Sequence, residues 1–241
     1  MREKILAIVL DIRRHNEKLN VVTLYTDLHG RLAFLSPVSV GKSGKLRQAR
    51  LQPLALIETE FLYNRSKELH RLGSFSLAAV WDNIYFHPLK RLTAIFISEF
   101  LSRILRATMP DPSLWKFLVD ALHRLNDITD GTADFHIIFL CEMLSHAGIT
   151  PETETSDSPL YFDMREGRFS SDPPMHHDVL SGDDAVFMRM APDLNFDHAG
   201  HLNFDRSSRR RITAFLLDYY AIHFPGISGM KSPEMLREIL S

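Results

Sequence analysis

Residues 4–36, KILAIVLDIRRHNEKLNVVTLYTDLHGRLAFLS, define the architecture of the first part of the chain. They hold three short runs of apolar and β-branched residues, 4–12, 19–26 and 31–36, separated by polar segments of hairpin-loop size. Runs of this kind, bounded by turn residues such as Gly30, are typical of antiparallel strands. The segment therefore predicts three consecutive strands.

Two further strands are predicted at 53–63 and 68–79, with Gly73 as a bulge or bend in the second. Residues 39–50, which lie between the third and fourth strands, contain no acidic residue and are expected to form a basic loop. Five short strands in about eighty residues indicate a small closed or partly open barrel, such as the OB-fold. An SH3-like barrel would give nearly the same pattern.

From about residue 88 the apolar residues recur with a helical period. Asp111 followed by Pro112 predicts the start of a second helix, and Thr132 is expected to cap a third that runs to about His146. Further helices are expected from about Ser208 and from Ser232. Residues 150–205 have 12 acidic residues against three arginines, and predict an irregular insertion with a hairpin at 161–169 and one short helix.

The predicted fold class is α+β. An OB-fold-like, five-stranded barrel at 1–80 precedes an all-α helical domain at 81–241, which carries the acidic insertion at about 150–205. The 45% hydrophobic and 24% charged content is ordinary for a globular protein and excludes a disordered chain. One cysteine excludes a disulfide scaffold, and the short apolar runs predict neither a signal peptide nor a membrane span. We expect a cytoplasmic protein.

Charge divides the chain unevenly. Residues 1–80 contain 13 lysines and arginines against 7 acidic residues, whereas residues 81–241 contain 15 against 23. Basic side chains that contact phosphates give affinity for nucleic acid without sequence preference, and aromatic residues such as Tyr25, His29 and Phe34 are candidates for base stacking. A solvated basic face is the alternative. The predicted nucleic-acid-binding residues are Arg13, Arg14, Lys18, Arg31, Lys42, Lys45, Arg47 and Arg50.

Enzyme signatures are weak. The segment Gly41-Lys42-Ser43 resembles the end of a phosphate-binding P-loop, but the motif needs glycine at position 36, where the chain has Ser36, and the segment gives no helix signal. Cys141 lies in an apolar helical stretch and is expected in the core. We therefore predict a protein without catalytic residues.

A metal site is the remaining chemical alternative. The acidic insertion contains four histidines, but their spacing matches no standard zinc motif, so they are expected on the surface. Asp193, Asn195 and Asp197 copy three positions of a calcium loop, while His198 and Phe204 replace its glycine and its glutamate. No cofactor is predicted. The histidines are His176, His177, His198 and His201.

The order of these parts resembles the RecO family of bacterial DNA repair and recombination mediators. The resemblance rests on short segments spread along most of the chain, none of them diagnostic alone. They are Ala7-Ile8-Val9-Leu10 with Arg13, Leu24-Tyr25-Thr26 with His29-Gly30-Arg31-Leu32, Gly41-Lys42-Ser43, Leu51-Gln52-Pro53-Leu54, and Lys231-Ser232 through Leu240.

The resemblance implies an N-terminal OB-fold, a helical C-terminal domain and no catalytic turnover. It implies binding of single- and double-stranded DNA, annealing of complementary strands, and two protein partners. These are RecR and the acidic-hydrophobic tail of the single-stranded DNA-binding protein SSB, with which the family loads RecA at gaps. The basic runs Lys90-Arg91 and Arg209-Arg210-Arg211 are candidates for the contact with that tail.

The chain departs from the family in the insertion. Many members carry a four-cysteine zinc module where this chain has Glu152 to Asp157 and Asp172 to Asp178, so we expect that the zinc is lost. Two other functions stay open from the residues alone. One is a protein-interaction adaptor that binds no DNA, and the other is a metal-dependent hydrolase that uses the histidines and aspartates of 176–205.

Overall fold

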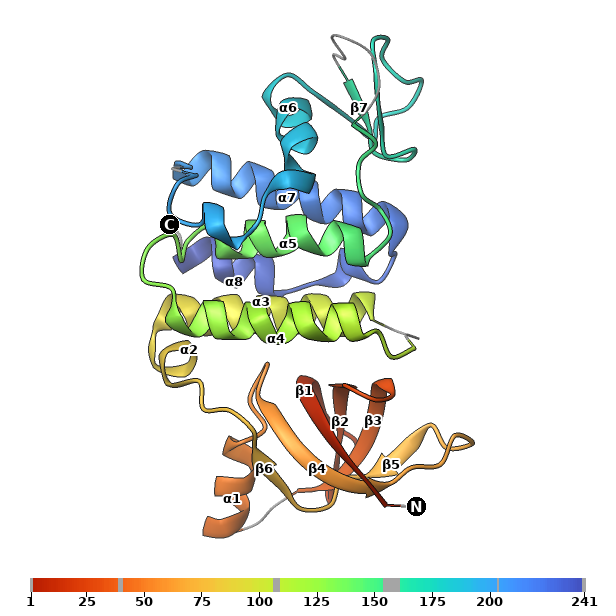
Figure 1. The fold of residues 1–241 in the computed structure, drawn as a ribbon, viewed down its shortest axis with the longest axis vertical. Coiled ribbons are helices and arrows are strands. Elements are labelled where there is room, and N and C mark those ends of the chain that lie inside the picture. Colours follow the sequence, from red (N-terminus) through yellow and green to blue (C-terminus); the bar gives the residue numbers. More distant parts are fainter. Residues whose placement is uncertain (1, 39–40, 106–108, 154–160, 203, 240–241) are drawn as a thin grey trace. The chain divides into compact units, whose positions relative to one another are not determined.

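The structure is a computed structural model that describes residues 2–38, 41–105, 109–153, 161–202 and 204–239. Contacts divide the chain into two compact units, residues 1–127 and residues 128–241. The first unit contains the strands and also the helices that directly follow them (Figure 1). The predicted domain boundary near residue 80 stays a prediction.

Unit 1 begins with a six-stranded sheet that does not close, with the order β5-β3-β2-β1-β4-β6. The prediction of five strands is corrected in one place, because the predicted strand 68–79 divides into β5 and β6 at opposite edges of the sheet. The chain crosses between them at Gly73, where a Cβ would lie 3.3 Å from the carbonyl oxygen of Glu60. The strands are β1 (Arg2–Arg14), β2 (Leu19–Thr26), β3 (Gly30–Pro37), β4 (Leu56–Leu62), β5 (Leu69–Arg71) and β6 (Phe75–Leu77).

The core of the sheet forms because alternate residues of β1 to β4 point to one face. Val22, Leu24 and Phe34 are fully buried there. In β1 every residue from Ala7 to Leu10 is buried, since a helix covers the other face: the Ser98 hydroxyl donates to the carbonyl oxygen of Leu10 at 2.6 Å.

The predicted basic loop at 39–50 is wrong in its second part, which forms helix α1 (Lys42–Ala49). Lysine, leucine, arginine, glutamine and alanine are good helix formers, and the glycines had masked this propensity. Gly41 precedes the helix with a φ of 91°, which a residue with a side chain rarely adopts. One argument against a P-loop therefore fails, while the absence of glycine at position 36 stands.

Three helices complete unit 1: α2 (Asp82–Phe86), α3 (Pro88–Ile104) and α4 (Pro112–Asp127). The predicted cap of α4 is confirmed, since the Asp111 carboxylate accepts from the backbone N–H groups of Ser113 at 2.8 Å and Leu114 at 3.1 Å. Tyr25, from the sheet, stacks on Trp115 of α4 with ring centroids 6.3 Å apart.

Unit 2 is helical around α5 (Phe135–His146), α7 (Arg206–His223) and α8 (Ser232–Ile239). Thr132 does not cap α5 as predicted, because the helix begins three residues later, after Asp134. The Asp205 carboxylate caps α7 by accepting from the N–H of Ser208 at 2.7 Å. No helix within the described ranges is long and apolar enough to span a membrane.

The insertion contains the predicted hairpin, β7 (Tyr161–Asp163) with β8 (Arg168–Ser170), and the predicted short helix, α6 (Asp183–Met190). A third strand, β9 (Val179–Ser181), pairs with the free edge of β7 and was not predicted. Single 3₁₀ turns at Ala191–Asp193, Phe196–His198 and Ile227–Gly229 complete the unit.

Candidate nucleic-acid interface

The hairpin between β1 and β2 carries three of the predicted residues. Arg13, Arg14 and Lys18 are exposed, and the Asn16 amide oxygen closes the turn by accepting from the N–H groups of Lys18 at 2.9 Å and Leu19 at 2.8 Å. This turn keeps the three basic residues within one short hairpin.

The segment before α1 reaches the same end of the sheet. The N–H of Val38 donates to the carbonyl oxygen of Lys18 at 2.8 Å, so β3 ends beside the hairpin. The backbones of Lys42 and Lys45 lie in α1, and their side chains fall outside what the structure describes. Arg50 is exposed at the C-terminal end of α1.

Arg47 has a structural role instead. Its guanidinium donates to the carbonyl oxygens of Leu72 at 3.3 Å and Gly73 at 2.6 Å, and lies 5.0 Å from the centroid of the Phe75 ring. These contacts attach α1 to the crossing between β5 and β6. Arg47 is therefore committed to the fold and is a poor phosphate ligand.

Arg31 is half-buried and pairs with Tyr25, whose side chain has no exposed surface. It lies four residues before Leu35 in β3, which corresponds to about 13 Å along a strand. The structure therefore does not bring Arg31 together with the hairpin residues.

Arg71 was missed by the sequence reasoning and joins the set. Arg13 pairs with Val21, Val21 with Leu35, and Leu35 with Arg71, so the four residues form one row across β1, β2, β3 and β5. Residues directly opposite each other in a sheet share a face. We call these four residues the basic row: two exposed arginines at its ends and two half-buried apolar side chains between them.

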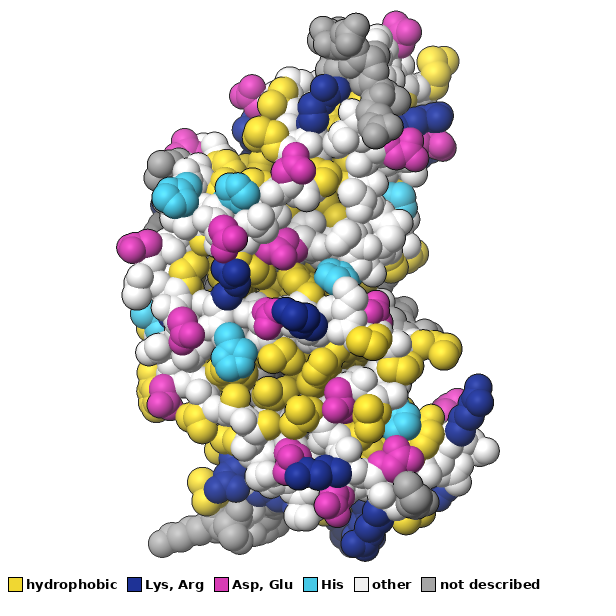
Figure 2. All heavy atoms as spheres, in the orientation of Figure 1, with side chains coloured by type: hydrophobic (Ala, Val, Ile, Leu, Met, Phe, Trp, Pro, Cys, Tyr) yellow, Lys and Arg dark blue, Asp and Glu magenta, His cyan; other side chains and the backbone are white. Residues whose placement is uncertain are grey.

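The basic row is a local feature. Arg13 forms an ion pair with Asp11 at 2.5 Å, yet 75% of its side chain is exposed. On the face drawn in Figure 2, basic and acidic side chains are interspersed, and no broad surface of one sign is visible. Phosphate binding here would exchange Asp11 for a phosphate as the partner of Arg13.

The stacking candidates are mostly in the core. Tyr25 and Phe34 are fully buried, and burial raises the pKa of Tyr25 to about 12. His29 keeps 17% of its side chain exposed, but one ring face stacks on Tyr63 at 3.8 Å and Nε2 lies 2.6 Å from the Glu3 carboxylate. Base stacking on Tyr25 or Phe34 is therefore excluded in this structure.

The histidines of the insertion do not form a metal centre within the described residues, which contain no group of three or more His, Cys, Asp or Glu side chains that could hold an ion. His176 lies 3.2 Å from the Asp163 carboxylate, while His177 and His201 are exposed. The Asn195 side chain caps the turn that contains His198 instead of a calcium loop.

Asp163 makes several contacts within the insertion, the segment in which the zinc module is expected to be lost. Its carboxylate accepts from the N–H groups of Arg165 at 2.9 Å and Glu166 at 3.1 Å. Burial opposes the charge, but these bonds and the contact with His176 together lower the pKa of Asp163. Arg165 adds an ion pair with Asp178 at 2.6 Å.

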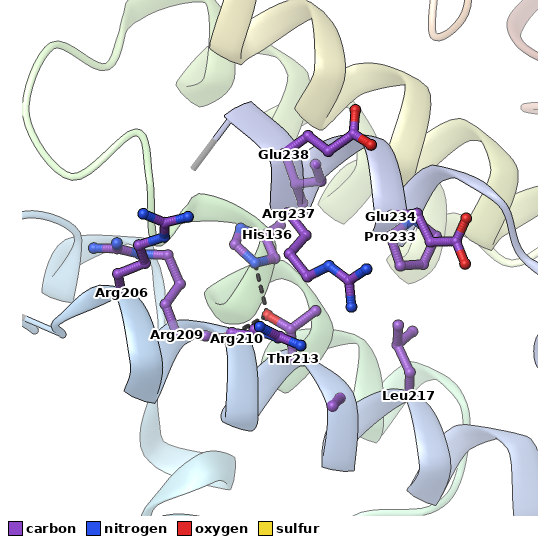
Figure 3. Close-up of a pocket in the computed structure, with 12 residues that line it drawn as sticks. His136, Arg206, Arg209, Arg210, Thr213, Leu217, Pro233, Glu234, Arg237 and Glu238 are labelled. Atoms are coloured by element: carbon purple, nitrogen blue, oxygen red, sulfur yellow. Dashed lines mark hydrogen bonds between the residues drawn. The ribbon is translucent and has the colours of Figure 1, made fainter. Parts of the chain in front are cut away.

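Unit 2 has a pocket of about 350 Å³ between α7 and α8 (Figure 3). Its apolar lining includes Leu217 and Leu236, and its rim carries the guanidinium groups of Arg206, Arg210 and Arg237. Arg237 reaches from α8 toward the side of α7 that carries Arg210 and Thr213 (Figure 3).

Two lining residues of this pocket, Arg209 and His136, are held by contacts with other side chains. The Arg209 guanidinium donates to the Asp134 carboxylate at 2.6 Å, and the exposed fractions of the two side chains are 15% and 6%. His136 contacts the Thr213 hydroxyl at 2.8 Å, and burial together with Arg209 lowers the pKa of His136 to about 3. His136 is thus neutral at physiological pH.

Lys90-Arg91 is one of the two basic runs that are candidates for the contact with the acidic tail. Its first residue, Lys90, has a structural role. Lys90 is buried, and its ammonium donates to the carbonyl oxygen of Asn126 at 2.7 Å, at the end of α4. Desolvation lowers the pKa of Lys90.

Cys141 lies in the core as expected, and burial raises the pKa of its thiol, which makes it a poor nucleophile.

Comparison with known proteins gives matches along almost the whole chain. The family model described as "Recombination protein O N terminal" matches residues 1–81, and that described as "Recombination protein O C terminal" matches residues 88–232. A DNA repair protein RecO of Bacteroides fragilis is 30% identical over 240 residues, which cover 99% of each chain.

Two other relatives agree with this match. A DNA repair protein RecO of Porphyromonas gingivalis is 28% identical over 234 residues, covering 95% of this chain and 96% of its own. One of Flavobacterium psychrophilum is 29% identical over 243 residues, covering all of both chains.

Proposed function

The chain belongs to the RecO family of DNA repair proteins, and from this premise we propose that it binds single- and double-stranded DNA and anneals complementary strands. The observation that carries the proposal is the basic row together with the neighbouring hairpin, which brings Arg13, Arg14, Lys18 and Arg71 to one end of the sheet. Annealing joins two polyanions, so it needs cations that offset their repulsion.

Half-buried Val21 and Leu35 add an apolar strip between the arginines. Phosphate contacts alone bind any strand, whereas apolar surface is useful only when bases are unpaired and accessible. This combination favours single-stranded over double-stranded DNA, which agrees with a protein that acts at gaps.

The family membership also supports two protein partners, RecR and the tail of SSB, with which the chain would load RecA onto SSB-coated DNA in the nucleoid. We place the SSB tail in the pocket between α7 and α8. Half-buried Leu217 offers apolar surface, and Arg210 and the exposed Arg237 offer charge for the acidic part of the tail, in a lining that also includes Glu234 and Glu238. A non-enzymatic mediator needs no catalytic group, and the function rests on these binding surfaces.

Strand annealing tests the proposal. Fluorescence transfer between two complementary labelled oligonucleotides should report fast annealing by the wild-type chain and slow annealing by the triple variant Arg13→Gln, Arg14→Gln, Lys18→Gln. Lys116→Gln is the control, since Lys116 is an exposed residue of α4 that pairs with Asp120. Equal annealing rates of the triple variant and the wild type would contradict the proposal.

A separate titration tests the tail site. An acidic peptide with an apolar C-terminal residue should bind the wild-type chain and lose affinity in Leu217→Ser. Leu217 is half-buried, so the variant is expected to fold. If the peptide binds both proteins equally, the pocket is not the tail site.

A further inference from the structure

The N-terminal half of α7 carries a second, open hollow of about 570 Å³. It is lined by Arg206, Ser207, Arg210, Arg211 and Ala214. It shares Arg206, Arg210 and Ala214 with the pocket between α7 and α8, whereas Ser207 and Arg211 belong to the hollow alone. We call it the arginine hollow.

The spacing of the lining residues follows the helix. Arg206 and Arg210 are four residues apart, as are Ser207 and Arg211, so the side chains of each pair lie about 6 Å apart on one face. All five lining residues are exposed or half-exposed, and none of them is acidic. The hollow is therefore a compact surface with three guanidinium groups.

The three guanidinium groups of the arginine hollow stay accessible to a ligand. Arg211 lies 3.2 Å from the Asp184 carboxylate, but 52% of its side chain is exposed. Among the residues that the structure describes, Arg206 and Arg210 have no carboxylate within ion-pair distance. Arg209, the other arginine in this part of α7, forms an ion pair with Asp134 and does not line the hollow.

The chemistry of the lining selects the ligand. Ala214 is the largest apolar side chain in the hollow, so an acidic-hydrophobic peptide finds nothing there for its apolar end. Phosphodiester groups need only cations and hydroxyl donors, which the arginines and Ser207 supply, and arginine binds phosphate with two parallel hydrogen bonds.

We propose that the arginine hollow is a second phosphate-backbone site, which holds a nucleic-acid strand different from the one on the basic row. The proposal rests on the proposed annealing function and adds to it. Each compact unit contributes one site, so a single chain binds two strands and raises their concentration near each other. In this proposal the acidic unit of the chain also takes part in binding DNA.

The stoichiometry of a short oligothymidylate on the full chain, measured by native mass spectrometry at low salt, tests this. The wild-type chain should bind two oligonucleotides, and Arg206→Gln with Arg210→Gln should bind one. Arg13→Gln with Arg71→Gln should also bind one, at the other site. The control Lys116→Gln with Arg168→Gln removes the same charge from two exposed ion-paired positions and should still bind two.

Salt titration gives a second readout. The single variants Arg206→Gln and Arg210→Gln, which keep part of the site, should each reduce the slope of log K against log salt for the second strand by about 0.7, the value expected for one phosphate contact. Circular dichroism checks that both single variants keep their helices.

The outcomes separate the two proposals. If the wild-type chain binds no oligonucleotide, the proposed function fails. If it binds one, which Arg13→Gln with Arg71→Gln removes, the function stands and this inference is overturned. If Arg206→Gln with Arg210→Gln still binds two oligonucleotides, the inference is again overturned, and loss of the acidic peptide by that variant would show that the arginines serve the peptide pocket.

Discussion

Arg13 and Arg71 lie at the two ends of one row of the sheet and point to the same face, although β2, β3 and β4 separate them in the chain. Three strand spacings of about 4.8 Å put them about 14 Å apart. The parallel pairing of β5 with β3 creates this relationship, because it aligns Arg71 with Leu35. A single strand of nucleic acid that lies across the row meets an arginine on each side of Val21 and Leu35.

Arg71→Gln is expected to weaken binding of single-stranded DNA about as much as Arg13→Gln, because both residues end the same row. Each substitution should reduce the slope of log K against log salt by about 0.7. Fluorescence anisotropy at several salt concentrations measures both effects. A weaker affinity with Arg13→Gln and an unchanged one with Arg71→Gln would show that only the hairpin binds.

Arg47→Gln should destabilise unit 1 and leave the salt slope of DNA binding unchanged. The variant lacks the hydrogen bonds to the carbonyl oxygens of Leu72 and Gly73, which together contribute about 1–2 kcal/mol. Urea denaturation measures the free energy of unfolding. Arg50→Gln, at the exposed end of α1, is the matched control and should unfold like the wild type; a reduced slope for Arg47→Gln would instead return Arg47 to the DNA site.

Asp134 and Arg209 should show strong coupling. Removing either charge leaves the other one buried, which costs about 3 kcal/mol, whereas removing both costs less than the two single changes together. A double-mutant cycle with Asp134→Leu and Arg209→Met, measured by denaturation, checks this. Additive effects would mean that the pair contributes nothing as a pair.

The insertion should lose stability in acid. The pKa of Asp163 is lower in the folded chain than its ordinary value of 3.8, so its contribution is complete above that value and disappears as pH falls through the folded pKa. The difference in free energy of unfolding between wild type and Asp163→Asn should therefore be largest near neutral pH and shrink below about pH 4.

Asp172→Asn, which changes an exposed acidic residue of the same segment, is the control for that titration. Its difference from the wild type should show no comparable change. A gap between wild type and Asp163→Asn that stays constant down to pH 3 would mean that the charge of Asp163 does not hold the insertion.

Local signals predicted the parts of the fold that depend on neighbours in the chain. Asp111 caps α4 as its position before Pro112 suggests, and the frame around Phe162 and Gly167 forms the predicted hairpin. The predictions failed where contacts between distant residues decide. Helix α1 is attached by Arg47 to the crossing at Gly73, and the glycines around it had suggested a loop.

The candidate site shows the same division. Arg13, Arg14 and Lys18 were predicted from their place in a short hairpin, and the structure keeps them together. Arg71 was missed because its position depends on a parallel pairing that no local pattern indicates. Arg31 was included for its charge, but it lies at the other end of β3 from Leu35 and therefore far from the hairpin residues.

The most direct test of the DNA-binding claim is the anisotropy of a labelled single-stranded oligonucleotide titrated with the wild-type chain and with Arg13→Gln, Arg14→Gln, Lys18→Gln, Arg71→Gln. We expect the wild type to bind with log K falling linearly with log salt. The fourfold variant should have a slope shallower by about 3, because it lacks four cations that each neutralise one phosphate, at about 0.7 per phosphate. Identical affinities and slopes for the two proteins, or no binding by the wild type at low salt, would contradict this claim.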